Sequence, residues 1–315
     1  MPNRSPNAKD WDLRLQKRKM SGQQAFSYVE KCLESYKHVF NPDILRDKVV
    51  FITGGGSGIC FTITEVFLRH QCDAVIVGRN VERLRKSADT LMKATGRRCL
   101  YYQVDVRKPQ DILNAIDETL KVYGRIDYLI NGAAGNFLCP LESMSYNAFK
   151  TVIEIDTLGT FNTSKAMYER YFKNNGGVII NITATLHYRG QALQAHVGSA
   201  KAAIETLTRH MAVEWGPDRI RVMCVAPGPI ADTEGMRRLA GGVLPEALTQ
   251  GIPIQRIGER VEIGNVCLFL VTSMAELLTG TVVVADGGSW LASSNDFAQR
   301  SKLFTSVSNS SRSKL

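Results

Sequence analysis

Several features that would restrict the function of this protein are missing from its 315 residues. No apolar run approaches the roughly 20 residues that a transmembrane helix needs, and the first residues form no apolar secretory signal. The seven cysteines are scattered and form no Cys-x-x-Cys pair, which argues against a zinc site and a disulfide framework. We therefore expect reduced thiols in an intracellular compartment, no metal and no membrane span.

A basic stripe interleaved with aromatic residues is also missing, although the chain carries a net charge of +9. Part of the excess lies near the N-terminus, at Arg14, Lys17, Arg18 and Lys19. Nucleic-acid binding needs Lys and Arg gathered on one face or along one helix. The remaining positive charge better suits a small ligand with several phosphates, so we expect no nucleic-acid partner.

The two ends of the chain lack the periodic apolar pattern of the middle. Residues 1–30 are polar, basic and aperiodic, and we predict a disordered N-terminal extension there. Residues 31–300 are expected to form one folded domain, and residues 301–315 a polar, Ser-rich tail. Because the middle contains no repeat and no linker, we expect no second domain.

The stretch from Val49 to Cys60 has the pattern of a strand, a tight turn and a helix start. Its first half is a short run of β-branched and aromatic residues, typical of a buried parallel strand. Four of the five residues in Gly54–Gly58 are glycine, so backbone N–H groups can closely approach a phosphate. Apolar residues recur through Ile59–His70 and predict a partly buried helix. Together these elements predict an anion site for a pyrophosphate.

From Val49 onward, predicted strands and helices alternate. Further strands are predicted at Ala74–Gly78, Cys99–Val104, Tyr128–Ile130, Val178–Ile182, Val222–Val225 and Thr281–Ala285, and helices at Val81–Lys93, Ile112–Tyr123, Phe149–Phe172, Ala200–Trp215 and Glu262–Val271. This alternation predicts an α/β fold, a single-domain, Rossmann-like, doubly wound parallel sheet with helices on both faces. Ligands of such sheets bind at the carboxyl ends of the strands.

Four motifs stand in a fixed order along the chain. They are Thr53-Gly54-x-x-x-Gly58-Ile59, Asp105-Val106, Asn131-Gly132-Ala133-Ala134-Gly135 and Pro227-Gly228. In this order they resemble the short-chain dehydrogenase/reductase family. Longer strings, among them Ala134–Pro140, Asn147–Lys150, Gly190–Gln194, Gly198–Lys201 and Pro227–Ile230, are similar to the branch that reduces 2,4-dienoyl thioesters of coenzyme A. The resemblance runs from about Cys32 to the C-terminus, and it implies a homo-oligomer of two or four chains.

The end of the second predicted strand bears on the choice of cofactor. An enzyme that prefers NAD places a carboxylate there, on the ribose hydroxyls. This chain has Gly78-Arg79-Asn80 instead, with Arg83 one helical turn later. Because guanidinium groups pair well with a 2′-phosphate, Arg79 and Arg83 predict NADPH.

The resemblance implies the rest of the cofactor site. The predicted members are Gly54, Gly56, Ser57, Gly58, Ile59, Arg79, Arg83, Asp105, Asn131, Lys201, Pro227, Gly228, Ile230 and Thr233. Asp105 is expected at the adenine, Asn131 on the adenosine side, the Pro227–Ile230 loop at the nicotinamide and Thr233 near the phosphates. Cys60 departs from the family pattern, which has glycine there, and we expect its side chain to crowd the helix start against the strand.

The usual catalytic residues of the family are missing. Most members place a Tyr four residues and a Ser seventeen residues before the Lys, and with Lys201 these positions hold Val197 and Ala184. Neither residue can exchange the proton of an alcohol. Reduction of a conjugated thioester instead needs an oxyanion site and a proton delivered to carbon. We therefore predict Lys201 at the oxyanion and the nicotinamide ribose, and Asp156, which replaces an Asn of the family, as proton donor through a water.

Other interpretations of these residues stay open. Lys201 could serve the cofactor alone, and Asp156 could only orient Lys201. Rival proton donors are His187, Tyr188 and His196. Tyr188 follows the fifth strand and could reach the pocket, whereas His196 faces elsewhere if its segment is helical.

The resemblance also implies a site for the acyl-CoA substrate. Phe137, Ser145, Tyr146 and Asn147 are expected to line the acyl channel, and Arg79, Arg107 and Arg238 to meet the phosphates of coenzyme A. The pair Arg237-Arg238 could alternatively be a solvated basic turn.

The last three residues, Ser313-Lys314-Leu315, match a peroxisomal address. They predict a peroxisomal location and binding to the import receptor. The expected activity is NADPH-dependent reduction of 2,4-dienoyl-CoA to enoyl-CoA in peroxisomal β-oxidation. Two alternatives are a trans-2-enoyl-CoA reductase and a non-catalytic NADPH-binding module, the latter because the Ser–Tyr pair is absent.

Overall fold

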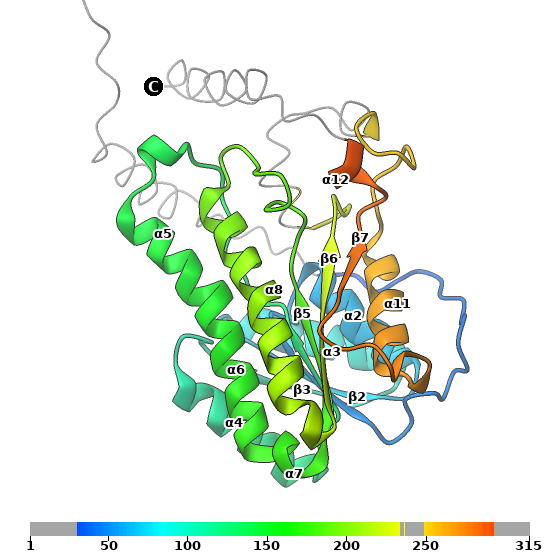
Figure 1. The fold of residues 1–315 in the computed structure, drawn as a ribbon. Helices are drawn as coiled ribbons and strands as arrows, with labels where there is room; N and C mark the ends of the chain where they lie inside the picture. Colours follow the sequence, from blue (N-terminus) through cyan, green and yellow to red (C-terminus); the bar gives the residue numbers. More distant parts are fainter. Residues whose placement is uncertain (1–29, 234–235, 237–248, 293–315) are drawn as a thin grey trace, which may run out of the picture.

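Seven parallel strands form one sheet at the centre of the protein (Figure 1). The structure is a computed structural model that describes residues 30–233, 236 and 249–292. The strand order is β3-β2-β1-β4-β5-β6-β7, so the chain winds outward from β1 in one direction and then from β4 in the other. The strands are β1 Val49–Thr53, β2 Asp73–Gly78, β3 Cys99–Gln103, β4 Tyr128–Asn131, β5 Gly177–Ile182, β6 Ile220–Pro227 and β7 Val282–Ala285. This arrangement confirms the predicted doubly wound α/β fold.

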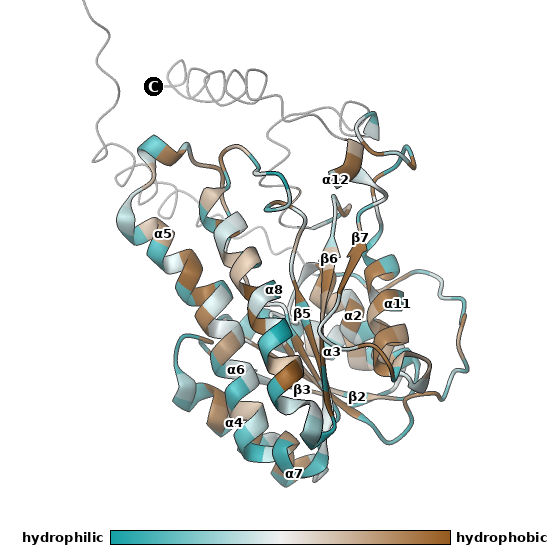
Figure 2. Ribbon diagram, viewed as in Figure 1, coloured by the Kyte–Doolittle hydropathy of each residue, from teal (hydrophilic) through white to brown (hydrophobic). Residues whose placement is uncertain are grey.

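Helices cover both faces of the sheet. One face is covered by α2 (Gly58–Arg69), α3 (Val81–Thr95) and α11 (Arg260–Val271), and the other by α4 (Pro109–Tyr123), α6 (Gly159–Met167) and α8 (Ala195–Trp215). Apolar residues fill the strands and the inner helix faces, whereas hydrophilic residues lie on the outer helix faces (Figure 2). Each face of the sheet therefore has its own buried apolar cluster, as expected for a parallel sheet covered on both sides.

The helical stretches predicted across Phe149–Phe172 join into one longer, irregular helix. It runs through α5 (Tyr146–Ile153), α6 and α7 (Lys173–Asn175), with wide π-type turns at Glu154–Leu158 and Tyr168–Phe172. Asp156 lies inside the first wide turn. Wide turns of this kind are frequent at functional sites, because they redirect a side chain without ending the helix.

The N-terminal boundary set at residue 30 needs a correction. Glu30 is 4% exposed, and its carboxylate contacts α2 and α11, so it belongs to the folded domain. Residues that follow it, including Tyr36 and Phe40, pack against the apolar cluster of α2 and α11. The predictions for residues 1–29 and for the 301–315 tail lie outside the described residues.

The predicted crowding at Cys60 is wrong, because a glycine faces it. A Cβ built on Gly132 would lie 2.0 Å from the sulfur of Cys60, so the sulfur occupies space that only a glycine leaves open. Burial raises the pKa of the Cys60 thiol to about 12, which keeps it protonated. The strand and the helix start therefore accommodate the side chain.

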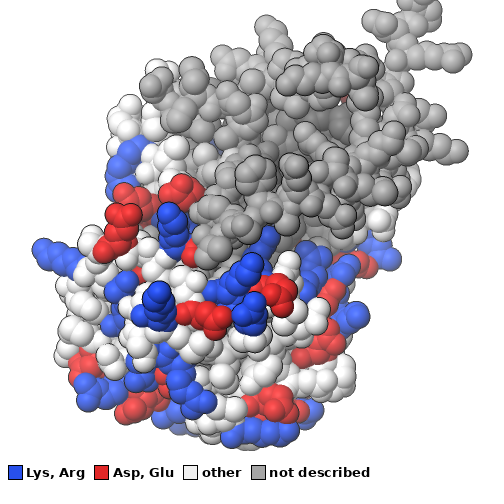
Figure 3. All heavy atoms as spheres, turned by 180° about the vertical axis from the view of Figure 1, so that it is seen from behind, with Lys and Arg blue, Asp and Glu red and all other residues white. Residues whose placement is uncertain are grey.

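The described surface carries charges of both signs. Figure 3 shows Lys and Arg interspersed with Asp and Glu over the described part of one face. Among the residues that the structure describes, no helix is both long and apolar enough to span a membrane. No group of three His, Cys, Asp or Glu side chains in the described ranges could hold a metal ion.

Candidate active site

A cavity of about 1220 Å³ lies at the carboxyl ends of the strands. It is lined by the Gly-rich turn, the ends of β2 and β3, the turn after β4, the loop after β5, part of α8 and the loop after β6. The structure brings every predicted cofactor residue to this cavity except Asn131. The cavity is thus at the edge of the sheet where the fold predicts a ligand.

Asn131 turns away from the cavity, contrary to its expected place beside the adenosine. Its Nδ2 donates hydrogen bonds to Ser164 Oγ (3.0 Å) and Asn181 Oδ1 (2.9 Å). The side chain is buried, and it joins β4 to α6 and β5. We therefore assign it to the sheet and its covering helix, and the next two residues, Gly132 and Ala133, line the cavity instead.

The Gly-rich turn has the shape that a dinucleotide phosphate requires. Gly54 has φ +71°, and a Cβ there would lie 2.9 Å from the carbonyl oxygen of Gly132. Gly58 has φ +59° and open space where a side chain would stand. Thr53 Oγ1 accepts hydrogen bonds from the N–H groups of Gly132 and Ala133, which ties this turn to the next. The residues present therefore fit a nicotinamide dinucleotide, with its pyrophosphate at the start of α2.

Two arginines flank this turn at the end of β2. Arg79 and Arg83 both line the cavity and are exposed. Asn80 caps α3 by accepting a hydrogen bond from the Arg83 N–H at 2.9 Å. The Cγ of Arg83 would lie 3.6 Å from a Cβ built on Gly56, so the arginine stem packs beside the glycines.

A buried ion pair joins the two predicted catalytic residues. Lys201 Nζ lies 3.0 Å from Asp156 Oδ2 and donates a hydrogen bond to the Ile182 carbonyl at 3.1 Å. Asp156 Oδ1 accepts a hydrogen bond from the Gly135 N–H at 2.7 Å. The contact with Lys201 lacks the direction of a hydrogen bond, so Oδ2 is held by charge alone. Lys201 lines the cavity, whereas Asp156 lies behind it and is 0% exposed.

The positions of the missing Ser and Tyr also face this cavity. Ala184 and Val197 both line it, and Val197 lies one helical turn before Lys201 on α8. The helix begins at Ala195, five residues earlier than predicted, which places Val197 on the same face as Lys201. Two apolar side chains therefore stand where an alcohol or ketone would need hydroxyl groups.

Two of the rival proton donors are directed elsewhere. The Tyr188 hydroxyl donates a hydrogen bond to Glu205 Oε1 at 2.9 Å, and His187 Nε2 lies 3.1 Å from Glu205 Oε2. Burial and the Glu205 carboxylate raise the pKa of Tyr188. Neither Tyr188 nor His187 lines the cavity.

His196 is closer to the site than its sequence position indicated. Its ring is fully buried and lies 4.2 Å from the Phe137 ring, centroid to centroid. Burial lowers the pKa of His196, while the charge of Asp156 and the nearby Phe137 carbonyl act in the opposite direction. The carbonyl is not in a hydrogen-bonding direction, and both ring nitrogens remain without a hydrogen-bond partner.

The predicted acyl-channel residues fall into two groups. Phe137 packs beside Val152 and Val197, behind the wall of the main cavity. Ser145 caps α5 by accepting a hydrogen bond from the Ala148 N–H. Tyr146 is 98% exposed, and the adjacent residue Asn147 is also exposed. None of the four lines the main cavity.

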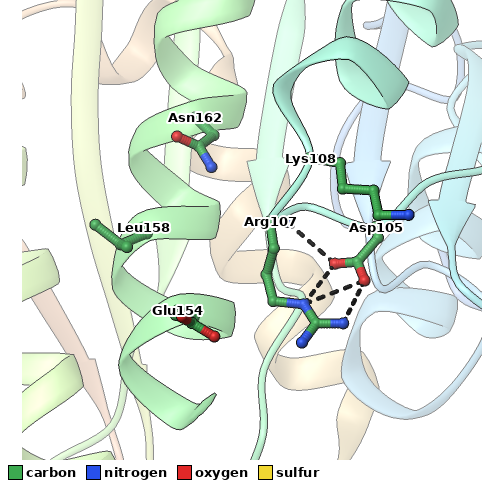
Figure 4. A pocket seen from close by; sticks show the side chains of 6 residues that line it. All are labelled: Asp105, Arg107, Lys108, Glu154, Leu158 and Asn162. Atoms are coloured by element: carbon green, nitrogen blue, oxygen red, sulfur yellow. Dashed lines mark hydrogen bonds and ion pairs between the residues drawn. The ribbon is translucent and has the colours of Figure 1, made fainter. Parts of the chain in front are cut away.

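A second cavity, of about 390 Å³, lies beside Arg107 (Figure 4). The Arg107 guanidinium binds both carboxylate oxygens of Asp105 and so lowers the pKa of Asp105. Asp105 lines both cavities, which makes it the residue that connects them. Arg238 and Ser313-Lys314-Leu315 lie outside the described residues.

Sequence reasoning missed several contributors to the site, among them the loop after β5 and Glu30. The loop after β5 lines the cavity through Thr183, Thr185 and Leu186 as well as Ala184, a position that the strand end alone could have indicated. Glu30 contacts the Gly-rich turn from outside the cavity. No local signal marks Glu30, because it follows a polar, aperiodic stretch.

Comparison with known proteins places the chain in a family. A family profile described as enoyl-(acyl carrier protein) reductase matches residues 54–289. A short-chain dehydrogenase from Bacillus anthracis is 35% identical and has a TM-score of 0.71, covering 78% of this chain and 97% of its own. The citronellol catabolism dehydrogenase of Pseudomonas aeruginosa is 29% identical, with a TM-score of 0.72 over 81% of this chain and 100% of its own. The chain belongs to the short-chain dehydrogenase/reductase family, which implies a nicotinamide cofactor.

Curated relatives narrow the likeness to one branch. The peroxisomal 2,4-dienoyl-CoA reductase [(3E)-enoyl-CoA-producing] of Danio rerio is 58% identical over 269 residues, which are 85% of this chain and 90% of the relative. The protein of the same name from Saccharomyces cerevisiae is 42% identical over 254 residues, 80% of this chain and 87% of the relative.

Proposed function

We propose that the protein is an NADPH-dependent reductase that converts 2,4-dienoyl-CoA esters to enoyl-CoA in the peroxisomal β-oxidation of unsaturated fatty acids. One observation carries this proposal: Lys201, paired with Asp156, faces the cavity where Ala184 and Val197 replace hydroxyl side chains. Such a site can stabilise an oxyanion, but it cannot exchange an alcohol proton through a Ser–Tyr pair. The names of the relatives point to the same substrate class.

The residues of the chain have separate tasks in this reaction. The Gly-rich turn and the Pro227–Ile230 loop would hold a nicotinamide cofactor, which when bound would supply a hydride to the far end of the diene. The Lys201 ammonium stabilises the negative charge that then develops on the thioester oxygen. Asp156 is ion-paired and must first take up a proton from solvent. It then passes this proton to carbon through a water, since its own carboxyl is buried behind Lys201. Phe137 and Val197 belong to one apolar cluster, and the Phe137 ring also lies 4.2 Å from the ring of His196.

The product follows from where hydride and proton add. Hydride at C5 and a proton at C2 leave the remaining double bond between C3 and C4, which is a 3-enoyl-CoA. The curated relatives carry the words (3E)-enoyl-CoA-producing in their names. Asp156 therefore has to serve C2, close to the thioester oxygen that Lys201 binds.

The preference for NADPH over NADH rests on Arg79 and Arg83. Both side chains lie at the end of β2, beside the glycines of the turn. A 2′-phosphate on the ribose would meet two guanidinium groups there, and the carboxyl end of β2 carries no carboxylate. Arg107 supports binding of coenzyme A phosphates only after it leaves Asp105, because the two side chains are paired.

The cellular setting completes the proposal. Ser313-Lys314-Leu315 form the address that the import receptor reads, which agrees with the peroxisomal names of the relatives. The working form is a homo-oligomer of two or four chains. Deleting Leu315 should leave the enzyme active and its fluorescent fusion in the cytosol.

A substrate comparison tests the function. NADPH oxidation should be rapid with 2,4-hexadienoyl-CoA and with a long-chain 2,4-dienoyl-CoA, slow with trans-2-enoyl-CoA, and much slower with NADH. The product should be identified by NMR as the 3-enoyl thioester. Turnover of trans-2-enoyl-CoA without turnover of dienes would favour a monoene reductase. Tight NADPH binding without any turnover would favour a non-catalytic module.

A further inference from the structure

The segment Glu30–His38 follows α2 from its first residue to its end. Four contacts join the segment to the helix and its C-cap, and they come in chain order. The contacts are Glu30 with Gly58, Leu33 with Glu65, Tyr36 with Arg69 and His38 with His70. The segment is thus fixed along the helix whose first turn faces the cofactor cavity.

Glu30 is the first contact in this series, and its carboxylate has two partners. Oε1 accepts a hydrogen bond from the Gly58 N–H at 3.1 Å. Oε2 pairs with Arg260 Nη1 at 2.6 Å. The side chains of Glu30 and Arg260 are 3% and 14% exposed, so water does little to weaken either contact.

The backbone amide that Glu30 binds belongs to Gly58, where the Gly-rich turn passes into α2. Gly58 is the first residue of α2, lines the cavity and has φ +59°. The first turn of α2 contains no acidic residue, and Ser57 makes no side-chain capping hydrogen bond. An acceptor from a segment 28 residues earlier therefore holds this N–H, in place of a local cap.

Arg260 explains how a carboxylate can lie so close to a phosphate site. Uncompensated, its negative charge would oppose a pyrophosphate at the same helix start. Arg260 is the first residue of α11, and one turn later Gly264 packs against Val66 of α2. The guanidinium is thereby fixed beside α2, where it neutralises Glu30.

We propose that Glu30 is a positioning residue of the cofactor site, which fixes the Gly58 amide so that the neighbouring N–H groups of the turn are aimed at the cofactor pyrophosphate. The proposal rests on the nicotinamide site of the proposed function. Glu30 does not touch the cofactor. It acts through the backbone of the turn, and Arg260 keeps its charge from opposing the phosphate.

Three full-length variants test the role. Glu30→Ala should raise the Kd for NADPH about tenfold or more, since a hydrogen bond to a charged acceptor is lost. The kcat at saturating NADPH should stay unchanged. Glu30→Gln combined with Arg260→Met keeps an amide acceptor for the Gly58 N–H and leaves no charge unpaired, so its Kd should stay within about threefold of wild type. Glu34→Ala, at an exposed position nearby, is the matched control.

Adenosine 2′-monophosphate locates the effect, because it carries the 2′-phosphate but no pyrophosphate. Its inhibition constant should be the same in wild type and Glu30→Ala. Equal weakening of NADPH and this fragment would mean a general loosening of the site and would overturn the proposal. Tighter NADPH binding by Glu30→Ala would also overturn it, since the carboxylate would then act only as a repelling charge.

These results separate the proposal from the function on which it rests. A wild-type protein that binds neither NADPH nor NADH would contradict the nicotinamide site itself. A wild-type protein that binds NADPH, with an unchanged Kd in Glu30→Ala, would contradict only the role of Glu30.

Discussion

Two buried ion pairs stand near the cofactor cavity, and they differ in how completely their charges are satisfied. Both oxygens of Glu30 have directed partners, the Gly58 N–H and Arg260. In the second pair Asp156 has one directed partner, and its Oδ2 lies 3.0 Å from Lys201 without a directed hydrogen bond. We infer from this difference that the Glu30–Arg260 pair fixes the backbone, whereas the charges of the Lys201–Asp156 pair stay available to a ligand.

Their positions relative to the cavity agree with this distinction. Lys201 lines the cavity, whereas Arg260 and Glu30 do not. A buried charge with incomplete hydrogen bonding costs stability, and proteins retain such groups mainly where they serve a function. The Glu30–Arg260 pair has no such missing hydrogen bond. We therefore assign it the role of fixing the geometry of the Gly-rich turn.

The largest expected effect follows from removing Lys201. In Lys201→Ala, NADPH binding should weaken and hydride transfer should fall by about 10²–10³-fold, because one ammonium serves both ribose and oxyanion. Stopped-flow measurement of NADPH oxidation gives both quantities. Lys150→Ala, at an exposed position, is the control. Retained hydride transfer in Lys201→Ala would limit Lys201 to cofactor binding.

The second-largest effect is expected at Asp156, the partner of Lys201. Asp156→Asn keeps an oxygen for the Gly135 N–H, so NADPH affinity should change little. Steady-state turnover should fall by roughly 10²–10⁴-fold, as expected when a positioned acid is lost. A dienolate-like species should accumulate after hydride transfer in a single turnover. Normal turnover would instead assign the proton to water or to His196.

Breaking the other pair should affect stability rather than chemistry. Arg260→Met leaves Glu30 buried and unpaired, and should lower the free energy of unfolding by about 3–5 kcal/mol. The matched control is Arg256→Met, whose partner Glu262 is 41% exposed, and it should cost about 1 kcal/mol or less. Urea unfolding measures both. Equal losses of stability in the two variants would contradict the claim that the buried pair contributes more than the exposed pair.

A smaller effect is expected at Cys60, beside the turn that both pairs border. Cys60→Gly should lower the free energy of unfolding by about 1–2 kcal/mol, because it empties the space over Gly132 and places a glycine within α2. The kcat should not change. Thermal melting measures the change. A higher melting temperature in Cys60→Gly would support the original prediction that the Cys60 side chain crowds the helix start.

The smallest effect is a dependence on pH. Burial lowers the pKa of His70, beside the N-terminal segment, and of His196, beside Asp156. Because the unfolded chain binds these protons first, stability should be complete above about pH 6.5 and fall as the pH drops below it. His70→Gln and His196→Gln should each flatten this fall in melting curves. If the melting temperature of both variants fell with pH as steeply as that of the wild type, these two histidines would not be the source of the pH dependence.

Much of the fold was predictable because its signals are local. The strand and helix periods, the glycines of Gly54–Gly58 and the arginines after β2 each depend on residues close together in sequence. The family offsets from Lys201 likewise located Ala184 and Val197, and both positions line the cavity. The wide turn that carries Asp156 was not predicted, since the apolar period continues through it.

What the sequence by itself determined was the parallel sheet, the Gly-rich turn at the start of α2 and the absence of a Ser–Tyr pair. Only the tertiary structure decided which partners the polar side chains take. Tyr188 binds Glu205, Asn131 binds Ser164 and Asn181, and Glu30 binds Gly58. These partners lie 17 to 50 residues apart in the chain. A polar side chain has many potential partners in the sequence, and packing decides which of them comes within hydrogen-bonding distance.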